Sequence, residues 1–306
     1  MTRILVVGAG ATGGALGARL VAAGQDVTFL VRERRAAQLA ADGLRFRAPG
    51  TDTVHDVRVV TSLDGGDPFD LVIVAVKAPA LAAVVPTLTP AVGPGTRVVP
   101  LLNGMAHVDA LEAAFPGQVL GGIVMIVATL DDDATVVQMT SMSSLTIGGL
   151  HGDPVPDGVV EALAADGVAL EVVDDIAARL WAKWVFIAAA GVITCLFRGT
   201  VGDILAAGGE ATILEAVDEC ERVATAAGHP VGEAGHARSL ALLTEPGSGF
   251  TSSLYRDLQQ GDPVEAEHIL GDLAARAEAL GVRTPLLRAA LLQLRTHHQA
   301  LTRSGT

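Results

Sequence analysis

The stretch that decides the fold is Ile4–Gly13, Ile-Leu-Val-Val-Gly-Ala-Gly-Ala-Thr-Gly, near the start of a 306-residue chain. Its first four residues are wholly apolar, a pattern typical of a parallel strand that is buried on both faces. The next six follow the pattern G-x-G-x-x-G. Gly8 permits a tight turn, Gly10 lets the backbone approach a phosphate, and Gly13 lets the following helix pack close to the strand. The stretch therefore predicts a strand, a phosphate-binding turn and a helix.

Strand-like and helix-like segments alternate after this turn. An alternation of this kind predicts the α/β class, with a Rossmann-type doubly wound parallel sheet. A less regular antiparallel extension is expected over residues 119–149, with strand-like pieces at 122–130, 134–139 and 145–148. The expected strands of the parallel sheet are 4–7, 27–31, 71–76 and 97–102, with helices over 11–23 and 78–85.

The pattern changes from Asp175 onward, where strand-like segments stop and helical ones take over. We therefore expect a dinucleotide-binding domain over 1–174 and an all-α domain for substrate binding and catalysis over 175–306. The longest apolar stretch, 184–197, is too short to cross a bilayer and predicts a buried core helix. The expected helices are 176–197, 210–227, 234–243, 263–280 and 285–302.

Composition excludes several classes of protein. Half of the residues are apolar and 18% are charged, which fits a compact globular chain. A net charge of -13 argues against binding to nucleic acid or to an anionic membrane, although a small anionic ligand can still meet a local cluster of cations. Cys195 and Cys220 have no disulfide or metal-ligand spacing, and the eight histidines are scattered. We expect no metal site, no secretion signal and a cytoplasmic location.

The glycine turn predicts a cofactor site. Phosphates of a dinucleotide would meet the free N–H groups at the start of the following helix. The predicted cofactor-binding residues of the turn are Gly8, Gly10, Ala11, Thr12 and Gly13. The alternative is a glycine-rich turn with a purely structural role.

Arg32 follows the second expected strand, at the position that selects between the two nicotinamide dinucleotides. NAD-binding sites carry Asp or Glu there to hold the ribose 2′-hydroxyl, whereas an Arg can bind a 2′-phosphate. Arg34 and Arg35 add positive charge and Glu33 subtracts some. The pattern favours NADPH over NADH. The alternative is that residues 32–35 form a solvated turn.

Lys77 and Asn103 follow the third and fourth expected strands. Ligands bind outside the carboxyl ends of the strands in open parallel sheets, so both residues are candidates for cofactor or substrate contacts. The alternative for each is a cap or a surface position.

Lys183 is a charged residue inside a strongly apolar helical segment. Lysine is almost never fully buried without a partner, and burial lowers its pKa towards that of a proton donor that works near neutral pH. A ketone reductase needs such a group for the developing alkoxide. The alternative is a side chain that reaches the surface at the start of the helix.

Glu265 lies in Asp262-Pro263-Val264-Glu265 and has a structural explanation. Asp262 would cap a helix, Pro263 would be its first residue and Glu265 its third, as in a capping box. The Ser252-Ser253 pair likewise suggests a helix cap.

Taken together and in order, these residues resemble the ketopantoate reductase family (2-dehydropantoate 2-reductases) over nearly the whole chain. The resemblance implies a reductase of 2-oxo acids that uses NADPH in pantothenate and coenzyme A synthesis, with a helical domain that closes over the cofactor. It also implies that Arg32 and Lys77 contact the cofactor, Arg32 at the 2′-phosphate. The matching segments are Gly8–Gly13, Arg32, Lys77, Asn103–Met105, Leu180–Lys183, Ser252–Asp257 and Gly261–Glu265.

The same resemblance implies roles at the reacting end of the site. Lys183 matches the catalytic lysine, a general acid, and Glu265 matches the glutamate that positions the lysine and the substrate. Asn103 matches the asparagine between nicotinamide and substrate, and Ser253 matches the serine that binds the substrate carboxylate. These are the residues we expect to carry the reaction.

Two positions depart from the family pattern. The family's lysine helix usually carries asparagines four and eight residues after the lysine, where this chain has Ile187 and Gly191. Loss of two hydrogen-bonding side chains favours a more apolar substrate. Three hypotheses therefore stay open: a ketopantoate reductase, a relative that reduces a different 2-oxo acid or ketone, and a non-catalytic NADPH-binding sensor. A homodimer is a further open question, because the apolar faces of the last two helices pair either with a second chain or within the domain.

Overall fold

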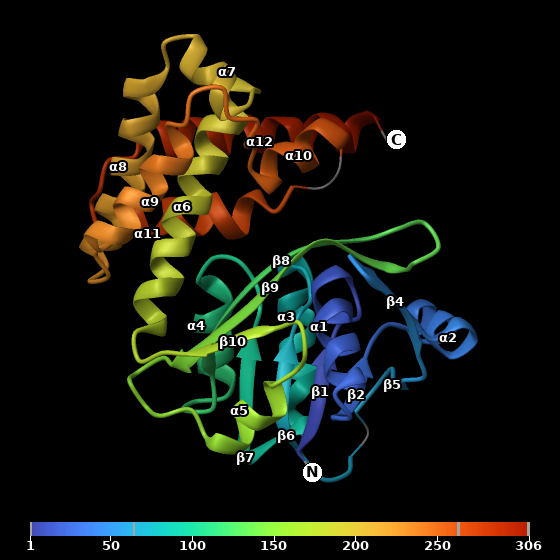
Figure 1. The fold of residues 1–306 in the computed structure, drawn as a ribbon. Coiled ribbons are helices and arrows are strands. Elements are labelled where there is room, and N and C mark those ends of the chain that lie inside the picture. Colours follow the sequence, from blue (N-terminus) through green and yellow to red (C-terminus); the bar gives the residue numbers. More distant parts are fainter. Residues whose placement is uncertain (1, 64, 262–263, 305–306) are drawn as a thin grey trace. The chain divides into compact units, whose positions relative to one another are not determined.

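The computed structural model describes residues 2–63, 65–261 and 264–304, and the chain divides into two compact units (Figure 1). The first unit consists of Met1–Leu102 and His107–Ala177. The second consists of Asn103–Ala106 and Ala178–Thr306. The short segment Asn103–Ala106 thus clusters with the helical unit, an assignment that the sequence pattern did not suggest.

A five-stranded parallel sheet forms the centre of the first unit and confirms the predicted fold class. Its order is β5-β2-β1-β6-β7, and every neighbouring pair is parallel. β1 lies in the middle and is buried from Ile4 to Val7, as its apolar sequence predicted. The strand bounds are β1 Arg3–Val7, β2 Asp26–Leu30, β5 Arg58–Val60, β6 Phe69–Val74 and β7 Val92–Pro100.

The expected antiparallel extension is present, and it belongs to a second five-stranded sheet in which parallel pairs also occur. β8 and β9 form a long antiparallel pair, and β9 also pairs in parallel with β10 and β3. The prediction was wrong in treating 134–139 and 145–148 as separate pieces, because the exposed stretch between them interrupts the apolar pattern of one continuous strand. β3, β4, β5 and β10 were not predicted. The bounds are β3 Leu44–Ala48, β4 Thr51–His55, β8 Leu120–Leu130, β9 Val136–Gly149 and β10 Ala169–Val172.

Helix α1 (Ala11–Ala22) contacts strands of both sheets. Small residues permit this close packing. A Cβ atom added at Gly14 would lie 2.6 Å from the Val136 side chain of β9, and one at Gly17 would lie 2.4 Å from the ring of Phe29 in β2. The glycines beyond the phosphate-binding pattern therefore serve the packing of α1 between two sheets.

The remaining helices of the first unit are short. The helix expected over 78–85 is broken, because Pro79, Pro86 and Pro90 favour 3₁₀ turns on both sides of a single α-helical turn. Residues 33–42 form a helix that was not predicted. The bounds are α2 Glu33–Asp42, α3 Leu81–Val84, α4 Ala106–Ala114 and α5 Asp157–Leu163, with 3₁₀ segments Ala78–Ala80 and Val85–Ala91.

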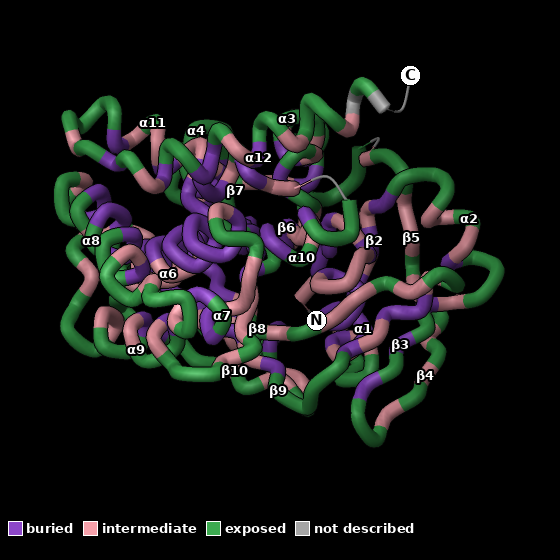
Figure 2. The backbone as a smooth tube through the Cα atoms, turned by 90° about the horizontal axis from the view of Figure 1, so that it is seen from above, coloured by how far each residue is buried: buried purple, intermediate pink, exposed green. Residues whose placement is uncertain are grey.

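The second unit is helical and is built around α6 (Ile176–Phe197), which is largely buried (Figure 2). By length and composition alone this helix could cross a membrane, yet 67% of its most apolar window is buried inside the structure, as in a core helix. The other helices are α7 Val201–Ala206, α8 Glu210–Ala226, α9 Glu233–Leu243, α10 Ser253–Gln260, α11 Asp272–Ala279 and α12 Pro285–Ser304, with a π-helical segment Glu267–Gly271 before α11.

A buried carboxylate joins α8 to the start of α12. Glu219 is completely buried, and its two oxygens each accept a hydrogen bond of 3.0 Å from the backbone N–H groups of Leu286 and Leu287. These N–H groups lack partners within their own helix, so the carboxylate satisfies the helix start.

The apolar faces of α11 and α12 pack against α8 and the π-helical segment inside the unit. The homodimer stays a prediction.

A matched pair of glycine substitutions tests the packing of α1. Gly17→Ala should destabilise the protein by about 1–3 kcal/mol, because its Cβ meets the completely buried ring of Phe29. Gly158→Ala in α5 should stabilise it by about 0.4–1 kcal/mol, because its Cβ meets nothing within 4 Å and alanine restricts the unfolded chain. Denaturant unfolding measures both changes. Equal stability of the two variants would contradict the packing account.

Candidate active site

The glycine turn between β1 and α1 contains glycines that the fold requires and one, Gly10, that the fold does not require. Gly8 has φ of +98° and donates its N–H to the Leu30 carbonyl at 2.9 Å, so its backbone conformation favours glycine. A Cβ at Gly13 would lie 2.1 Å from the Gly8 carbonyl oxygen. A Cβ at Gly10 would meet nothing within 4 Å. Protein packing thus explains Gly8 and Gly13 but leaves Gly10 unexplained, which is the arrangement that close approach of a phosphate requires.

Helix α1 begins at Ala11, followed by Thr12, and its N-cap residue Gly10 provides no side-chain hydrogen bond. The first N–H groups of a helix lack intrahelical partners and carry partial positive charge. The residues of the turn therefore fit the pyrophosphate of a dinucleotide.

Arg35 braces this turn from α2. Its Nε donates to the Ala9 carbonyl at 3.1 Å, and its Nη1 donates to the Ala134 carbonyl at 3.0 Å, in the turn between β8 and β9. Desolvation by burial lowers the pKa of Arg35. Sequence reasoning counted Arg35 only as a nearby charge. Its position in the sequence could have indicated this role, because Arg35 lies one helical turn after Arg32 and faces back towards the sheet.

Arg32 and Lys77 are exposed and follow β2 and β6, which flank β1 in the sheet. Arg32 is the residue before α2, and Lys77 the residue before the 3₁₀ segment Ala78–Ala80. Because parallel strands end at one edge, both side chains start from the edge that holds the glycine turn. Arg32 precedes a helix rather than lying in a solvated turn.

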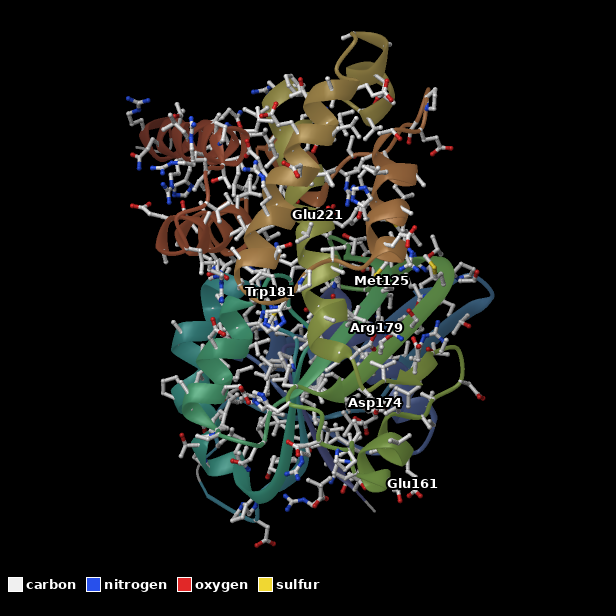
Figure 3. The ribbon with its side chains drawn as sticks, turned by 90° about the vertical axis from the view of Figure 1, so that its left-hand side faces the viewer. Met125, Glu161, Asp174, Arg179, Trp181 and Glu221 are labelled. Atoms are coloured by element: carbon white, nitrogen blue, oxygen red, sulfur yellow. The ribbon has the colours of Figure 1, made fainter. Side chains whose placement is uncertain are left out.

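Lys183 lies in the second turn of α6, and in the sequence it stands between two buried tryptophans, Trp181 and Trp184 (Trp181 is labelled in Figure 3). The residue is intermediate in exposure, but desolvation by burial lowers the pKa of its ammonium group from 10.5 to about 8. A lysine that reached freely into solvent would keep its ordinary pKa. The environment therefore fits a proton donor that works near neutral pH.

Glu265 lies before the helix, not within its first turn. The first helical residue is Ala266, so the expectation that Glu265 is the third helical residue is wrong. The proposed cap, Asp262-Pro263, lies outside the described residues. The Glu265 carbonyl accepts a hydrogen bond from Ile269 N–H at 3.4 Å, and the following segment Glu267–Gly271 is π-helical. π-helical turns are frequent at functional sites.

Ser252 and Ser253 have different environments. Ser252 is buried, caps α10 by accepting from Tyr255 N–H at 3.1 Å, and shares a hydrogen bond of 2.7 Å with Thr194 of α6. Ser253 is exposed as the first residue of α10. The predicted cap is confirmed for Ser252, and the substrate-binding role of the exposed Ser253 stays a prediction.

Asn103 is exposed and belongs to the helical unit, together with Lys183, Glu265 and Ser253. The structure therefore places all four predicted catalytic and substrate-binding residues in one unit. Asn103 is also a predicted cofactor contact, whereas the other predicted cofactor-binding residues, Arg32, Lys77 and the glycine turn, lie in the first unit.

The position of Gly191 explains why no asparagine occurs there. A Cβ at Gly191 would lie 2.7 Å from Cδ1 of Leu254 in α10 and 3.6 Å from Cδ2 of Leu270. Leucine side chains thus fill the space that a longer side chain at residue 191 would need. With Ile187 one turn earlier on α6, this side of the helix is apolar.

The described residues contain no group of three or more His, Cys, Asp and Glu side chains that could hold a metal ion. Both cysteines are buried and free, and burial raises the pKa of the Cys195 thiol to about 12. Neither thiol is suited to act as a nucleophile.

Comparisons with known proteins agree over most of the chain. The family model for ketopantoate reductase PanE/ApbA matches residues 4–152, and the model for its C-terminal domain matches residues 175–298. The uncharacterized oxidoreductase YkpB of Bacillus subtilis (strain 168) is 33% identical, covering 96% of this chain and 98% of that relative. A 2-dehydropantoate 2-reductase of Archaeoglobus fulgidus is 31% identical, covering 92% of each.

A solved structure with a TM-score of 0.84 covers 98% of this chain and 99% of its own, at 20% identity. It is the ternary structure of D-mandelate dehydrogenase with NADH and anilino(oxo)acetate. At this identity the similarity shows the fold alone.

Substitution of Gly10 separates ligand binding from stability. Gly10→Ala should leave the melting temperature near that of the native protein, because its Cβ meets no protein atom, but should raise the Kd for NADPH by about 10-fold or more. Coenzyme fluorescence titration measures the Kd. Gly158→Ala, far from the turn in sequence, is the control and should bind NADPH normally. Unchanged NADPH affinity in Gly10→Ala would show that the turn has only a structural role.

Proposed function

Because the chain belongs to the ketopantoate reductase family, we propose that it reduces the ketone of a 2-oxo acid with NADPH. The first substrate in this proposal is 2-dehydropantoate, which would be converted to pantoate in pantothenate biosynthesis. The observation that carries the proposal is the environment of Lys183, whose pKa is lowered to about 8 by burial.

The residues of the first unit fit a dinucleotide. The free space at Gly10 and the uncapped start of α1 suit the pyrophosphate. Arg32 would hold the 2′-phosphate that distinguishes NADPH from NADH, with Lys77 as a second cation at the same edge. NADPH, when bound, supplies the hydride for the reduction.

The residues of the helical unit supply the remaining chemistry. In its protonated form, Lys183 would donate a proton to the alkoxide oxygen that develops as the ketone is reduced. Glu265 would orient the lysine and the substrate, and Ser253 would bind the substrate carboxylate. Asn103 would hold the substrate against the nicotinamide. The presence of both Lys183 and Glu265 argues against a sensor without catalysis.

A second candidate is a reductase of a more apolar 2-oxo acid, and a specific observation favours it. Leu254 fills the space beside Gly191, and Ile187 replaces a hydrogen-bonding side chain, so both family asparagines are absent and one site is closed by hydrocarbon. A pocket without those groups loses strong selection for a hydroxyl. The same fold occurs in D-mandelate dehydrogenase, whose ternary structure contains NADH and anilino(oxo)acetate.

The setting of the enzyme is also part of the proposal. Two free, buried cysteines suit a reducing compartment, and we place the protein in the cytoplasm. The homodimer stays a prediction, and light scattering of the purified protein would measure its oligomeric state.

The substrate is tested by comparing kcat/KM for 2-dehydropantoate and for apolar 2-oxo acids, with NADPH and with NADH. We expect turnover with NADPH. Turnover by neither coenzyme with any 2-oxo acid would contradict the proposed function.

The double variant Gly191→Asn/Leu254→Ala tests the origin of the preference, because the alanine makes room for the asparagine. It should raise the ratio of kcat/KM for 2-dehydropantoate to that for an apolar 2-oxo acid by about 10-fold. Leu254→Ala alone is the control for the enlarged pocket. An unchanged ratio in the double variant would remove residue 191 from the substrate site.

A further inference from the structure

Three segments that carry proposed site residues meet at one buried indole. Trp184 follows Lys183 on α6 and is 1% exposed. Its Nε1 donates a buried hydrogen bond of 3.0 Å to the carbonyl oxygen of Ile269. Ile269 lies in the π-helical segment Glu267–Gly271, and its own N–H donates to the carbonyl of Glu265. A single side chain thus ties the lysine helix to the segment that follows Glu265.

The turn after Asn103 closes on the same contact. Gly104 has φ of +86°, and a Cβ added there would lie 2.7 Å from the His268 carbonyl oxygen and 3.8 Å from Trp184 Nε1. Only glycine permits this approach without displacing the π-helical segment. One contact is therefore shared by Gly104, which follows Asn103, by Trp184, which follows Lys183, and by the peptide groups after Glu265.

The π-helical segment is held from its other side by α12. Arg295 donates two hydrogen bonds of 2.7 Å to the carboxylate of Glu267, and this ion pair lowers the pKa of Glu267. Trp184 is braced in turn by Trp181, at 5.0 Å between ring centroids, and by the guanidinium of Arg276, at 5.4 Å from its ring. The shared contact is thus fixed on several sides, which suits a positioning role.

We propose that Trp184 is a positioning residue, whose hydrogen bond to the Ile269 carbonyl sets Lys183, Glu265 and Asn103 in register for the reaction. This inference rests on the proposed function for its kinetic consequences. The contact itself lies wholly within the helical unit and does not involve Arg32, Lys77 or the glycine turn, which are proposed to hold the phosphates of the cofactor. Loss of the hydrogen bond should therefore impair the chemical step much more than cofactor affinity.

Trp184→Phe tests the inference, because phenylalanine keeps an aromatic ring and removes the donor. We expect kcat to fall by about 10- to 100-fold, the scale expected when reacting groups are displaced by about 1 Å, with a much smaller change in the Kd for NADPH. Gly104→Ala, which pushes on the neighbouring carbonyl of His268, should produce the same pattern. Trp181→Phe is the matched comparison, since this indole is also buried on α6 beside Arg276, and among the described residues the structure records only ring contacts for it. Its kcat should fall by much less.

Hydrogen–deuterium exchange provides a readout that needs no substrate. Backbone amides over 265–271 should exchange faster in Trp184→Phe than in Trp181→Phe, with similar melting temperatures for the two variants. If the wild type reduces 2-oxo acids but both variants lose equal activity and exchange equally, the positioning role is wrong and the proposed function stands. If the wild type reduces none, the proposed function fails, and the exchange comparison alone decides whether Trp184 orders the segment: equal exchange overturns that role too.

Discussion

The close approach of α1 to strands of two sheets is the constraint on which the first unit depends. The helix can lie there only because Gly13, Gly14 and Gly17 present no side chain to the Gly8 carbonyl, to Val136 and to Phe29. Its N-terminus is thereby fixed at the carboxyl edge of the parallel sheet, directly after β1. The geometry of the phosphate-binding turn is therefore a consequence of helix packing. Gly10 is the exception, since no neighbouring protein atom requires it, and it separates the demands of the fold from those of the ligand.

A different contact organises the helical unit. Its proposed site residues come from three places in the sequence, near residues 103, 183 and 265. These segments are far apart in the chain, so only tertiary contacts can bring them together. A buried indole hydrogen bond and the backbone of a π-helical segment bring their neighbours together. An irregular helical segment persists where surrounding contacts fix its backbone. Here Arg295 holds the Glu267 side chain and Trp184 holds the Ile269 carbonyl.

The parts of the fold that were predicted correctly are those in which local pattern and tertiary environment agree. β1, with its apolar run and glycine turn, and α6, with its long apolar stretch, are buried as their sequences indicate. β3 was missed although Leu44–Ala48 alternates between buried and exposed residues and pairs with the next strand, β4, because each of these two strands is only five residues long. The helix over 78–85 failed because prolines outweighed the helical tendency of alanine.

The candidate site shows the same division. The sequence allowed Arg32, Lys77 and Lys183 to be identified as candidate site residues, because strand ends and an isolated lysine in an apolar helix are local features. The inward direction of Arg35, the position of Glu265 before its helix and the contact of Gly104 with a carbonyl 164 residues later are not, because each depends on a long-range neighbour. Apolar packing of Leu254 at Gly191 is of the same kind.

The account is tested most directly by the pH dependence of kcat/KM in both directions of the reaction. Burial disfavours the charged ammonium of Lys183 and lowers its pKa to about 8, so the proton donor is present below that pH and is lost above it. Ketone reduction should therefore decline as the pH rises through about 8, oxidation of the hydroxy acid should rise over the same range, and Lys183→Ala should abolish both limbs while still binding NADPH. A limb that persists in Lys183→Ala, or turnover that this variant retains, would contradict the central role of Lys183.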